Sequence, residues 1–240
     1  LNFYILSPNR YINFFIIRLF IPCLFWLAKM GLFNYYDQLE NSKGISIKQI
    51  NIKKGLIPIN IIRTNFFQSE KYFFEKKMKL RIKQNHMQKA LKVFNTFPKD
   101  RIKVFVHIRR GDYLQETFNG KRSITLPVSY FNNAMNSIEE DIDLPFYIFL
   151  SDDPEYVEQA FRHLNESDKY ISVNKPIVDF SLMTLCEYGI VSNSTFAWWG
   201  SYFMSNRKKV FFPKYWYGWK TKTESHPNIY PSWSKVIDVE

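Results

Sequence analysis

The stretch VFVHIRRGDYL, residues 104–114, decides the fold of the carboxyl-terminal half of the chain. Its first residues are mostly apolar and predict a buried strand, and the Arg-Arg-Gly-Asp run after them predicts a turn. Side chains alternate along a strand, so Val104 and Val106 share one face and His107 and Arg109 share the other. We therefore expect this strand to carry positive charge to one edge of a sheet.

Strands and helices alternate beyond this first strand. Short apolar runs predict the strands, and Asp153 and Pro154 are suited to begin a helix, with Gly189 expected just after the end of another. The alternation predicts an α/β fold with a parallel sheet, helices on both faces and a ligand site beyond the carboxyl ends of the strands. Strands are predicted at 101–108, 146–151, 170–173, 190–192 and 209–213, and helices at 126–140, 152–164, 179–188 and 194–205.

The first hundred residues follow a different pattern. Residues 49–63 predict short strands around a glycine and a proline, and residues 69–94 predict a helix whose lysines face solvent. The sequence NTFPKD, residues 95–100, interrupts this helical pattern. We therefore predict an amino-terminal domain of residues 1–98 and a second domain of residues 99–240.

The composition is basic, with 33 Lys and Arg against 22 Asp and Glu and a net charge of +11. This excess favours an anionic partner, although scattered lysines more often form a solvated surface. Nucleic acid is disfavoured as a partner, because the basic residues are dispersed and the arginine pair lies at a predicted ligand edge.

Residues 11–33 are strongly apolar but include Arg18, Pro22 and Lys29, which interrupt the run that a membrane-spanning helix needs. We interpret the segment as a buried helix, with a helix lying against a membrane as the alternative. Cys23 and Cys186 are far apart and are expected to be reduced core residues, as in a cytoplasmic protein.

The two arginines after the first strand, Arg109 and Arg110, suit a diphosphate because each guanidinium can bind phosphate oxygens through two N–H groups. Asp112 is suited to hydrogen-bond backbone groups of the turn. Structural ion pairs between the arginines and nearby aspartates are the alternative. The residue pattern leaves both interpretations open.

A second candidate site begins at Asn193, Ser194 and Thr195, between a short strand and a helix. A helix start at the ligand edge presents free N–H groups and a positive dipole end to an anion. The simpler interpretation is a helix cap formed by Ser194 or Thr195. Asp179 lies near another helix start, where it is suited either to cap that helix or to bind the donor edge of a guanine.

Two adjacent carboxylates, Asp152 and Asp153, follow the predicted strand 146–151. A pair of this kind is conceivable as a bridge to a metal ion, but the proline that follows favours the start of a helix. The sequence contains no glycine-rich phosphate loop of the Walker or dinucleotide-binding type.

Several motifs together resemble the bacterial α-1,2-fucosyltransferases of glycosyltransferase family 11. The resemblance covers roughly residues 60–235, and its motifs occur in a consistent order. They are FFQSEKYF (66–73), VFVHIRRGDY (104–113), FLSDD (149–153), DFSLMTLCEYGIVSNSTFAWWGSYF (179–203) and FFPKYW (211–216).

The resemblance implies a GT-B-like fold of two Rossmann-like domains, GDP-fucose as donor, a galactose-containing glycan as acceptor and no metal or other cofactor. It implies inverting transfer of L-fucose to a galactoside 2-hydroxyl. Arg109 would bind the pyrophosphate and stabilise the leaving GDP, beside His107 and Arg110. Asp179 would recognise guanine, and the residues from Asn193 to Thr195 would face the phosphates.

The general base is less clearly indicated by the sequence. Asp112 is the candidate nearest to the arginines, and Glu116 is a second one. The family's glycine-rich motif near the amino terminus has no counterpart here, so we expect a shortened amino-terminal domain. A non-catalytic fragment that binds GDP is the alternative function. The expected location is the cytoplasm, with peripheral contact to the inner face of a bacterial membrane.

Overall fold

The structure, a computed structural model, describes residues 22–23, 26–27, 30, 34–37, 60–63, 68–72, 81–225 and 228–240. The chain divides into two compact units. The first contains Leu1–Phe67 and Lys71–Glu75, and the second contains Gln68–Glu70 and Lys76–Glu240.

The first unit contains, among its described residues, two parallel strands, β1 (Asn34–Asp37) and β2 (Asn60–Arg63). β2 lies within the region predicted to form short strands. Of the predicted helix at 11–33, residues 22–23 and 26–27 are helical, and most of the rest lies outside the described residues. Cys23 is exposed and Trp26 is 61% exposed, so the prediction of burial is wrong at these two positions.

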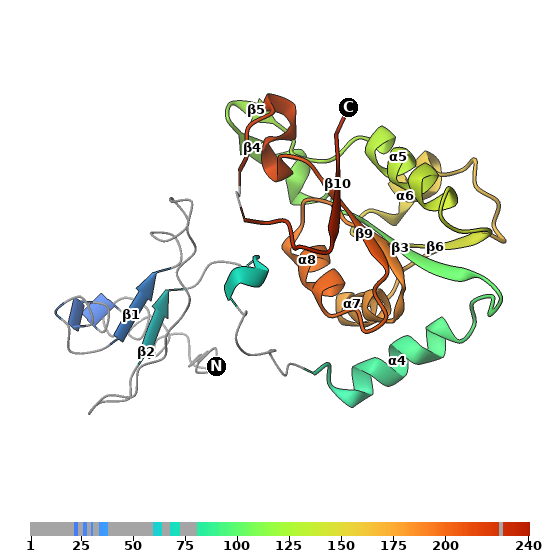
Figure 1. The fold of residues 1–240 in the computed structure, drawn as a ribbon, viewed down its shortest axis with the longest axis horizontal. Coiled ribbons are helices and arrows are strands. Elements are labelled where there is room, and N and C mark those ends of the chain that lie inside the picture. Colours follow the sequence, from blue (N-terminus) through green and yellow to red (C-terminus); the bar gives the residue numbers. More distant parts are fainter. Residues whose placement is uncertain are drawn as a thin grey trace. The chain divides into compact units, whose positions relative to one another are not determined.

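The second unit is built on a six-stranded parallel sheet in the order β10-β9-β8-β3-β6-β7 (Figure 1). If the strands are numbered 1 to 6 along the chain from β3, their order read from the β7 edge is 3-2-1-4-5-6. This is the order of a doubly wound Rossmann-like sheet. This confirms the predicted α/β fold and parallel sheet. The strands are β3 (Ile102–Ile108), β6 (Pro145–Ser151), β7 (Lys169–Ile171), β8 (Tyr188–Ile190), β9 (Lys209–Pro213) and β10 (Ser234–Ile237).

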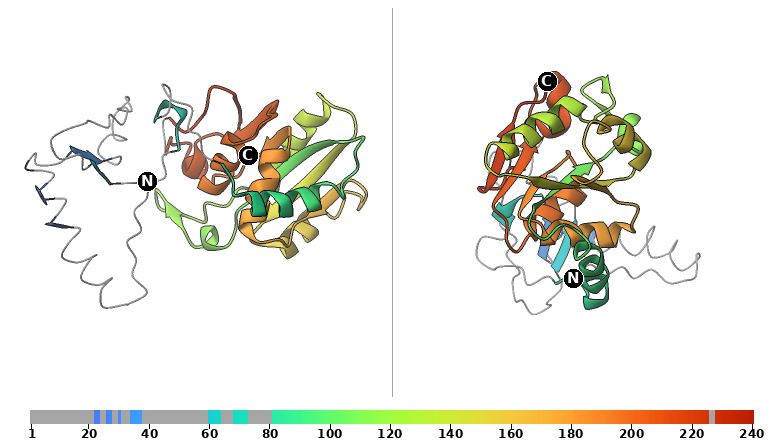
Figure 2. Two further views of the ribbon diagram at one scale, coloured as in Figure 1. Left: turned by 90° about the horizontal axis from the view of Figure 1, so that it is seen from below. Right: turned by 90° about the vertical axis from the view of Figure 1, so that its right-hand side faces the viewer.

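Helices cover both faces of this sheet, and two apolar clusters fill the space between the layers (Figures 1 and 2). On one face Phe105 packs with residues of α4, α7 and α8, and on the other Val104 and Val106 pack with residues of α5 and α6. The alternation predicted for β3 is therefore confirmed. The helices are α4 (Gln84–Phe94), α5 (Val128–Glu139), α6 (Pro154–Ala160), α7 (Pro176–Leu185) and α8 (Thr195–Tyr202).

Two local predictions differ from the structure. Gly189 lies inside β8 rather than after the end of α7, and a Cβ atom there would be 2.2 Å from the Phe105 ring, so close strand packing requires glycine. Of the helix predicted at 69–94, the described residues form a 3₁₀ turn, η2 (Glu70–Tyr72), a non-helical segment at 81–83, and α4, and residues 73–80 lie outside the described residues.

The division between the units falls before α4, earlier than the boundary predicted between residues 98 and 99. The physical reason is that Ala90 of α4 is fully buried, and Val93 and Phe94 pack against the same apolar cluster as α7. Within the described residues, no helix is both long enough and apolar enough to cross a membrane.

Candidate functional site

The site lies where the order of the sheet reverses, between β3 and its neighbour β8. In doubly wound sheets, the crevice outside the carboxyl ends of the strands at this switch point is the usual ligand position. The turn after β3 contains Arg109, Arg110 and Asp112, and the turn after β8 leads through Asn193 into α8. The fold therefore brings two of the predicted motifs together.

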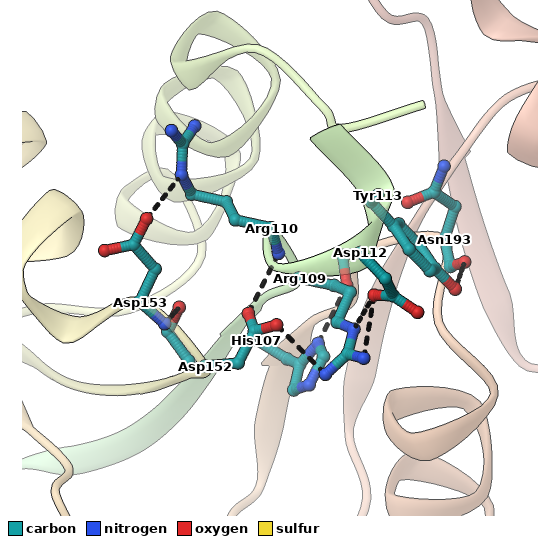
Figure 3. Close-up of polar contacts among 10 residues, drawn as sticks. His107, Arg109, Arg110, Asp112, Tyr113, Asp152, Asp153 and Asn193 are labelled. Carbon is teal, nitrogen blue, oxygen red and sulfur yellow. Dashed lines mark hydrogen bonds and ion pairs between the residues drawn. The ribbon is translucent and has the colours of Figure 1, made fainter. Parts of the chain in front are cut away.

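The adjacent arginines point in different directions (Figure 3). Arg109 Nη1 lies 3.0 Å from Asp152 Oδ2, and Nη2 lies 2.8 Å from Asp112 Oδ1. Arg110 turns the other way, where its Nε donates to Asp153 Oδ2 at 2.9 Å and its guanidinium lies 3.4 Å from the centre of the Tyr156 ring. Arg109 lies between Asp112 and Asp152, whereas Arg110 fixes the turn to α6.

Asp152 and Asp153, the two carboxylates after β6, have separate roles. Asp153 caps α6 by accepting from the Tyr156 backbone N–H at 3.1 Å, as the sequence predicted. Asp152 Oδ1 accepts from the Arg110 backbone N–H at 2.9 Å, and its other oxygen pairs with Arg109. Asp152 is thus part of the arginine turn.

Tyr113 connects the turn after β3 to the turn after β8. Its ring lies 5.6 Å from the Arg109 guanidinium, and its hydroxyl donates to the Asn193 carbonyl at 3.2 Å. Asn193 is fully buried, and its side-chain amide donates to the Ile124 carbonyl at 2.8 Å. Its amide oxygen has no partner among the described residues. Asn193 therefore holds the loops around the site together.

His107 lies on β3, 5% exposed, with its Nδ1 hydrogen-bonded to Ser192 Oγ at 2.7 Å. Its ring also contacts Phe196 of α8, at 5.5 Å between centroids. Burial, together with the positive charge of Arg109, lowers the pKa of His107 to about 3. The imidazole is therefore neutral at physiological pH and lies in the protein interior.

Ser194 and Thr195 begin α8, with Ser194 at the position before the first helical residue. The Ser194 side chain makes no capping hydrogen bond to the helix, contrary to the capping interpretation, although its backbone N–H donates to the Ser192 carbonyl at 2.7 Å. The N–H groups of the first turn of an α-helix lack intrahelical partners. The α8 start therefore keeps its donors and its positive dipole end at the carboxyl edge of β8.

Asp179 lies at the same sheet edge but in a separate hydrogen-bonded group. It is within α7 rather than at its cap, which is Lys175. Ser172 Oγ donates to Asp179 Oδ1 at 2.5 Å, and the Asn174 amide donates to Ser172 Oγ at 2.9 Å. Burial raises the pKa of Asp179 to about 6, although hydrogen bonds from Ser172 and Asn174 oppose the shift. A carboxylate held in this way can accept two N–H donors from a ligand.

Sequence reasoning did not select Asp152, Tyr113 or Ser192 as site residues. Tyr113 and Ser192 each lie beside a residue that it did select, Asp112 and Asn193, and Asp152 directly follows β6. The contacts of all three join segments between 42 and 85 positions apart. No local pattern carries that information. Across residues 81–225 and 228–240 and the shorter described segments, no three His, Cys, Asp or Glu side chains lie together as a metal site.

The order of the sheet and the arginine turn define the second unit as a doubly wound α/β domain with an arginine, held by two carboxylates, at its switch point. The family model "Glycosyl transferase family 11" matches residues 32–236, and the chain therefore belongs to that family.

The chain is similar to several proteins whose names describe sugar-transferring enzymes. An O-antigen biosynthesis glycosyltransferase, WbnK, of Escherichia coli is 31% identical over 50% of this chain and 40% of its own length. An α-1,2-colitosyltransferase of Escherichia coli is 33% identical over 57% of this chain and 49% of its own. A galactoside 2-α-L-fucosyltransferase of Caenorhabditis elegans is 29% identical over 63% of this chain and 45% of its own.

The chain spans less than half the length of each of these relatives in the aligned region. No solved structure matches it significantly.

Proposed function

We propose that this chain transfers L-fucose from GDP-fucose to the 2-hydroxyl of a galactoside, with inversion at the sugar carbon. The observation that carries the proposal is the position of Arg109, at the switch point of a doubly wound sheet in a family 11 chain. The named relatives support a fucose-like donor sugar, because one is a fucosyltransferase and another a colitosyltransferase.

The leaving group sets the first chemical requirement. The acceptor oxygen bonds to C1 of fucose while the bond from C1 to the β-phosphate oxygen breaks, and GDP keeps the electron pair. Arg109 and the α8 N-terminus provide positive charge where the negative charge develops, a task that other glycosyltransferases give to a metal ion. Arg110 supports this arrangement by holding the turn against α6.

The acceptor hydroxyl must lose its proton during the transfer. Asp112 is our candidate to take it, because its side chain is 56% exposed and lies in the same turn as Arg109. Glu116 is the alternative base. His107 is 5% exposed and its Nδ1 is hydrogen-bonded to Ser192, so we assign it to the wall of the nucleotide pocket rather than to the role of base.

Guanine recognition is assigned to Asp179. Its carboxylate lies at the carboxyl edge of the sheet and is positioned by Ser172, and an ionised carboxylate can accept the two N–H groups on the guanine edge. The diphosphate would then extend from the β7 side of the edge toward Arg109 and the residues Asn193, Ser194 and Thr195.

The test is a transfer assay with GDP-fucose and a panel of β-galactosides, with the anomeric configuration of the product read by NMR. We expect an α-linked product in the presence of EDTA, and no transfer from UDP sugars. GDP-colitose, the donor without the 3-hydroxyl of fucose, is the matched alternative. Transfer of colitose alone would reassign the donor sugar, and a β-linked product would contradict inversion.

A further inference from the structure

Two carboxylates hold the Arg109 guanidinium from opposite sides (Figure 3). Asp112 Oδ1 accepts from Nε at 3.0 Å and lies 2.8 Å from Nη2. Asp152 Oδ2 lies 3.0 Å from Nη1. One positive charge therefore faces two negative charges, and the immediate surroundings of Arg109 carry a net negative charge in this state.

The two carboxylates are anchored very differently. Asp152 is 25% exposed and uses both oxygens, one on Arg109 and the other on the Arg110 backbone N–H. The turn also packs closely around it, because a Cβ atom at Gly111 would lie 2.5 Å from Asp152 Oδ2. Asp112 is 56% exposed and contacts Arg109 through a single oxygen.

Asp112 occupies the part of Arg109 that an anionic ligand needs. The parallel Nε and Nη2 donors form one of the edges through which a guanidinium binds a phosphate by two hydrogen bonds. A diphosphate cannot use this edge while Asp112 Oδ1 remains there. The exposed ion pair is also weak, because water competes for both groups.

We propose that Asp152 is a positioning residue that fixes Arg109, and that Asp112 masks the same guanidinium until a diphosphate displaces it. The inference rests on the proposed diphosphate site and adds an order of events to it. Asp112 is released only when the donor is bound, so its carboxylate is free for the acceptor hydroxyl only in the donor complex. This arrangement makes the donor bind before the acceptor is activated.

The experiment is calorimetric titration of the whole chain with inorganic pyrophosphate, a probe without base or sugar. Asp112→Asn should bind pyrophosphate about fivefold more tightly than wild type, because an exposed ion pair of up to about 1 kcal/mol no longer competes. Asp152→Asn should bind about tenfold more weakly, because an amide cannot accept from both Arg109 and the Arg110 N–H. Asp143→Asn, which removes an exposed charge at the opposite edge of the sheet, is the matched control and should bind as wild type does.

A double-mutant cycle separates positioning from general damage to the fold. If Asp152 acts through Arg109, then Asp152→Asn should change pyrophosphate binding by less than about twofold in an Arg109→Ala background. Equal losses in both backgrounds would overturn the positioning role. Melting temperatures identify any unfolded variant, and Asp112→Asn tests the mask separately because its side chain is exposed.

The masking role would be overturned if Asp112→Asn bound pyrophosphate no more tightly than wild type. It would also be overturned if neither wild type nor Asp112→Asn bound pyrophosphate. The guanine part of the proposed function is tested separately, by comparing GDP with UDP. If only the guanine assignment is wrong, pyrophosphate binding will still respond to the variants as expected, but the chain will bind GDP and UDP equally well.

Discussion

The carboxyl ends of β3 and β7 lie on the same edge of one sheet but present opposite chemistry. At β3, a partly exposed arginine is held by two carboxylates. At β7, a buried carboxylate, Asp179, is held by Ser172 and Asn174. β6 lies between the two strands. The edge therefore offers a guanidinium at β3 and a carboxylate at β7, separated by one strand.

This difference matches the two ends of a guanine nucleotide. The diphosphate is an anion that needs N–H donors, and the guanine edge carries N–H donors that need an acceptor. Because β6 lies between β3 and β7, Arg109 and Asp179 are kept apart and do not neutralise each other's charge. The comparison predicts that substitutions at the end of β3 change the affinity for every nucleoside diphosphate. Substitutions at the end of β7 should change the affinity for guanine nucleotides alone.

The largest effect is expected at β3. Arg109→Ala should weaken binding of both GDP and UDP about 100-fold, because removing one partner of a charged hydrogen-bonded pair costs about 2–5 kcal/mol. The fold should persist, since Arg109 is partly exposed and contributes little to the core. Calorimetry with both nucleotides and a thermal melt check this prediction.

Arg110→Ala is the matched control for that variant. Loss of its contacts with Asp153 and Tyr156 should lower the melting temperature more than it lowers nucleotide affinity. A loss of affinity as large as that of Arg109→Ala would contradict the separate roles of the two arginines.

The next effect concerns stability at β7. The pKa of Asp179 rises from its ordinary value of 3.8 to about 6 on folding, because burial disfavours the charged form. The folded state therefore binds more protons than the unfolded state between about pH 4 and 6, and this carboxyl makes stability fall as pH rises through that window. Asp179→Asn lacks the penalty, so it should be more stable than wild type at pH 7, by on the order of 2 kcal/mol, and similar near pH 4.

Urea unfolding followed by tryptophan fluorescence measures this difference. The second unit contains five of the six tryptophans, so the signal reports mainly on it. A variant less stable than wild type at pH 7 would show that the hydrogen bonds of Asp179 outweigh the cost of its burial.

A smaller effect is expected on nucleotide choice. Asp179→Asn should lose about tenfold in affinity for GDP with little change for UDP, since only guanine uses the carboxylate. In wild type, the preference for GDP over UDP should decline as the pH falls below about 6, where Asp179 takes up a proton. UDP carries the same diphosphate as GDP, so protonation of the diphosphate affects both affinities equally. UDP is therefore the internal control. A preference independent of pH would remove Asp179 from guanine recognition.

The smallest effect is that of salt. Raising the salt concentration from about 0.05 M to 0.5 M should weaken pyrophosphate binding severalfold, because the Arg109 site is partly exposed and charges are screened. The ratio of GDP to UDP affinity should stay nearly constant, since it reflects hydrogen bonds to the base. A ratio that falls in parallel would place guanine selectivity at the arginine turn as well.

The sequence predicted the sheet better than it predicted the site. Apolar runs and helix starts located β3, β6, β9 and the helices between them, because those signals are local. β10 was missed, since residues 234–237 include only two apolar side chains and depend on pairing with β9 for their strand structure.

The arginine turn shows why the site was only partly predictable. The sequence placed two arginines at one point, but adjacent side chains diverge, and Arg110 packs on Tyr156. Asp152 was interpreted as the start of a helix, because its contact with Arg109 crosses from β6 to β3. Pairing of distant strands creates these contacts, and periodicity in one segment does not reveal it.

The most direct test of the account is a calorimetric titration of the wild-type chain with GDP and with UDP, at pH 7.5 and at pH 5. We predict tighter binding of GDP than of UDP at pH 7.5, with most of that preference lost at pH 5 and binding of both nucleotides weakened about 100-fold in Arg109→Ala. Equal affinity for GDP and UDP at pH 7.5, in a folded chain, would contradict a guanine nucleotide site extending from β7 to β3.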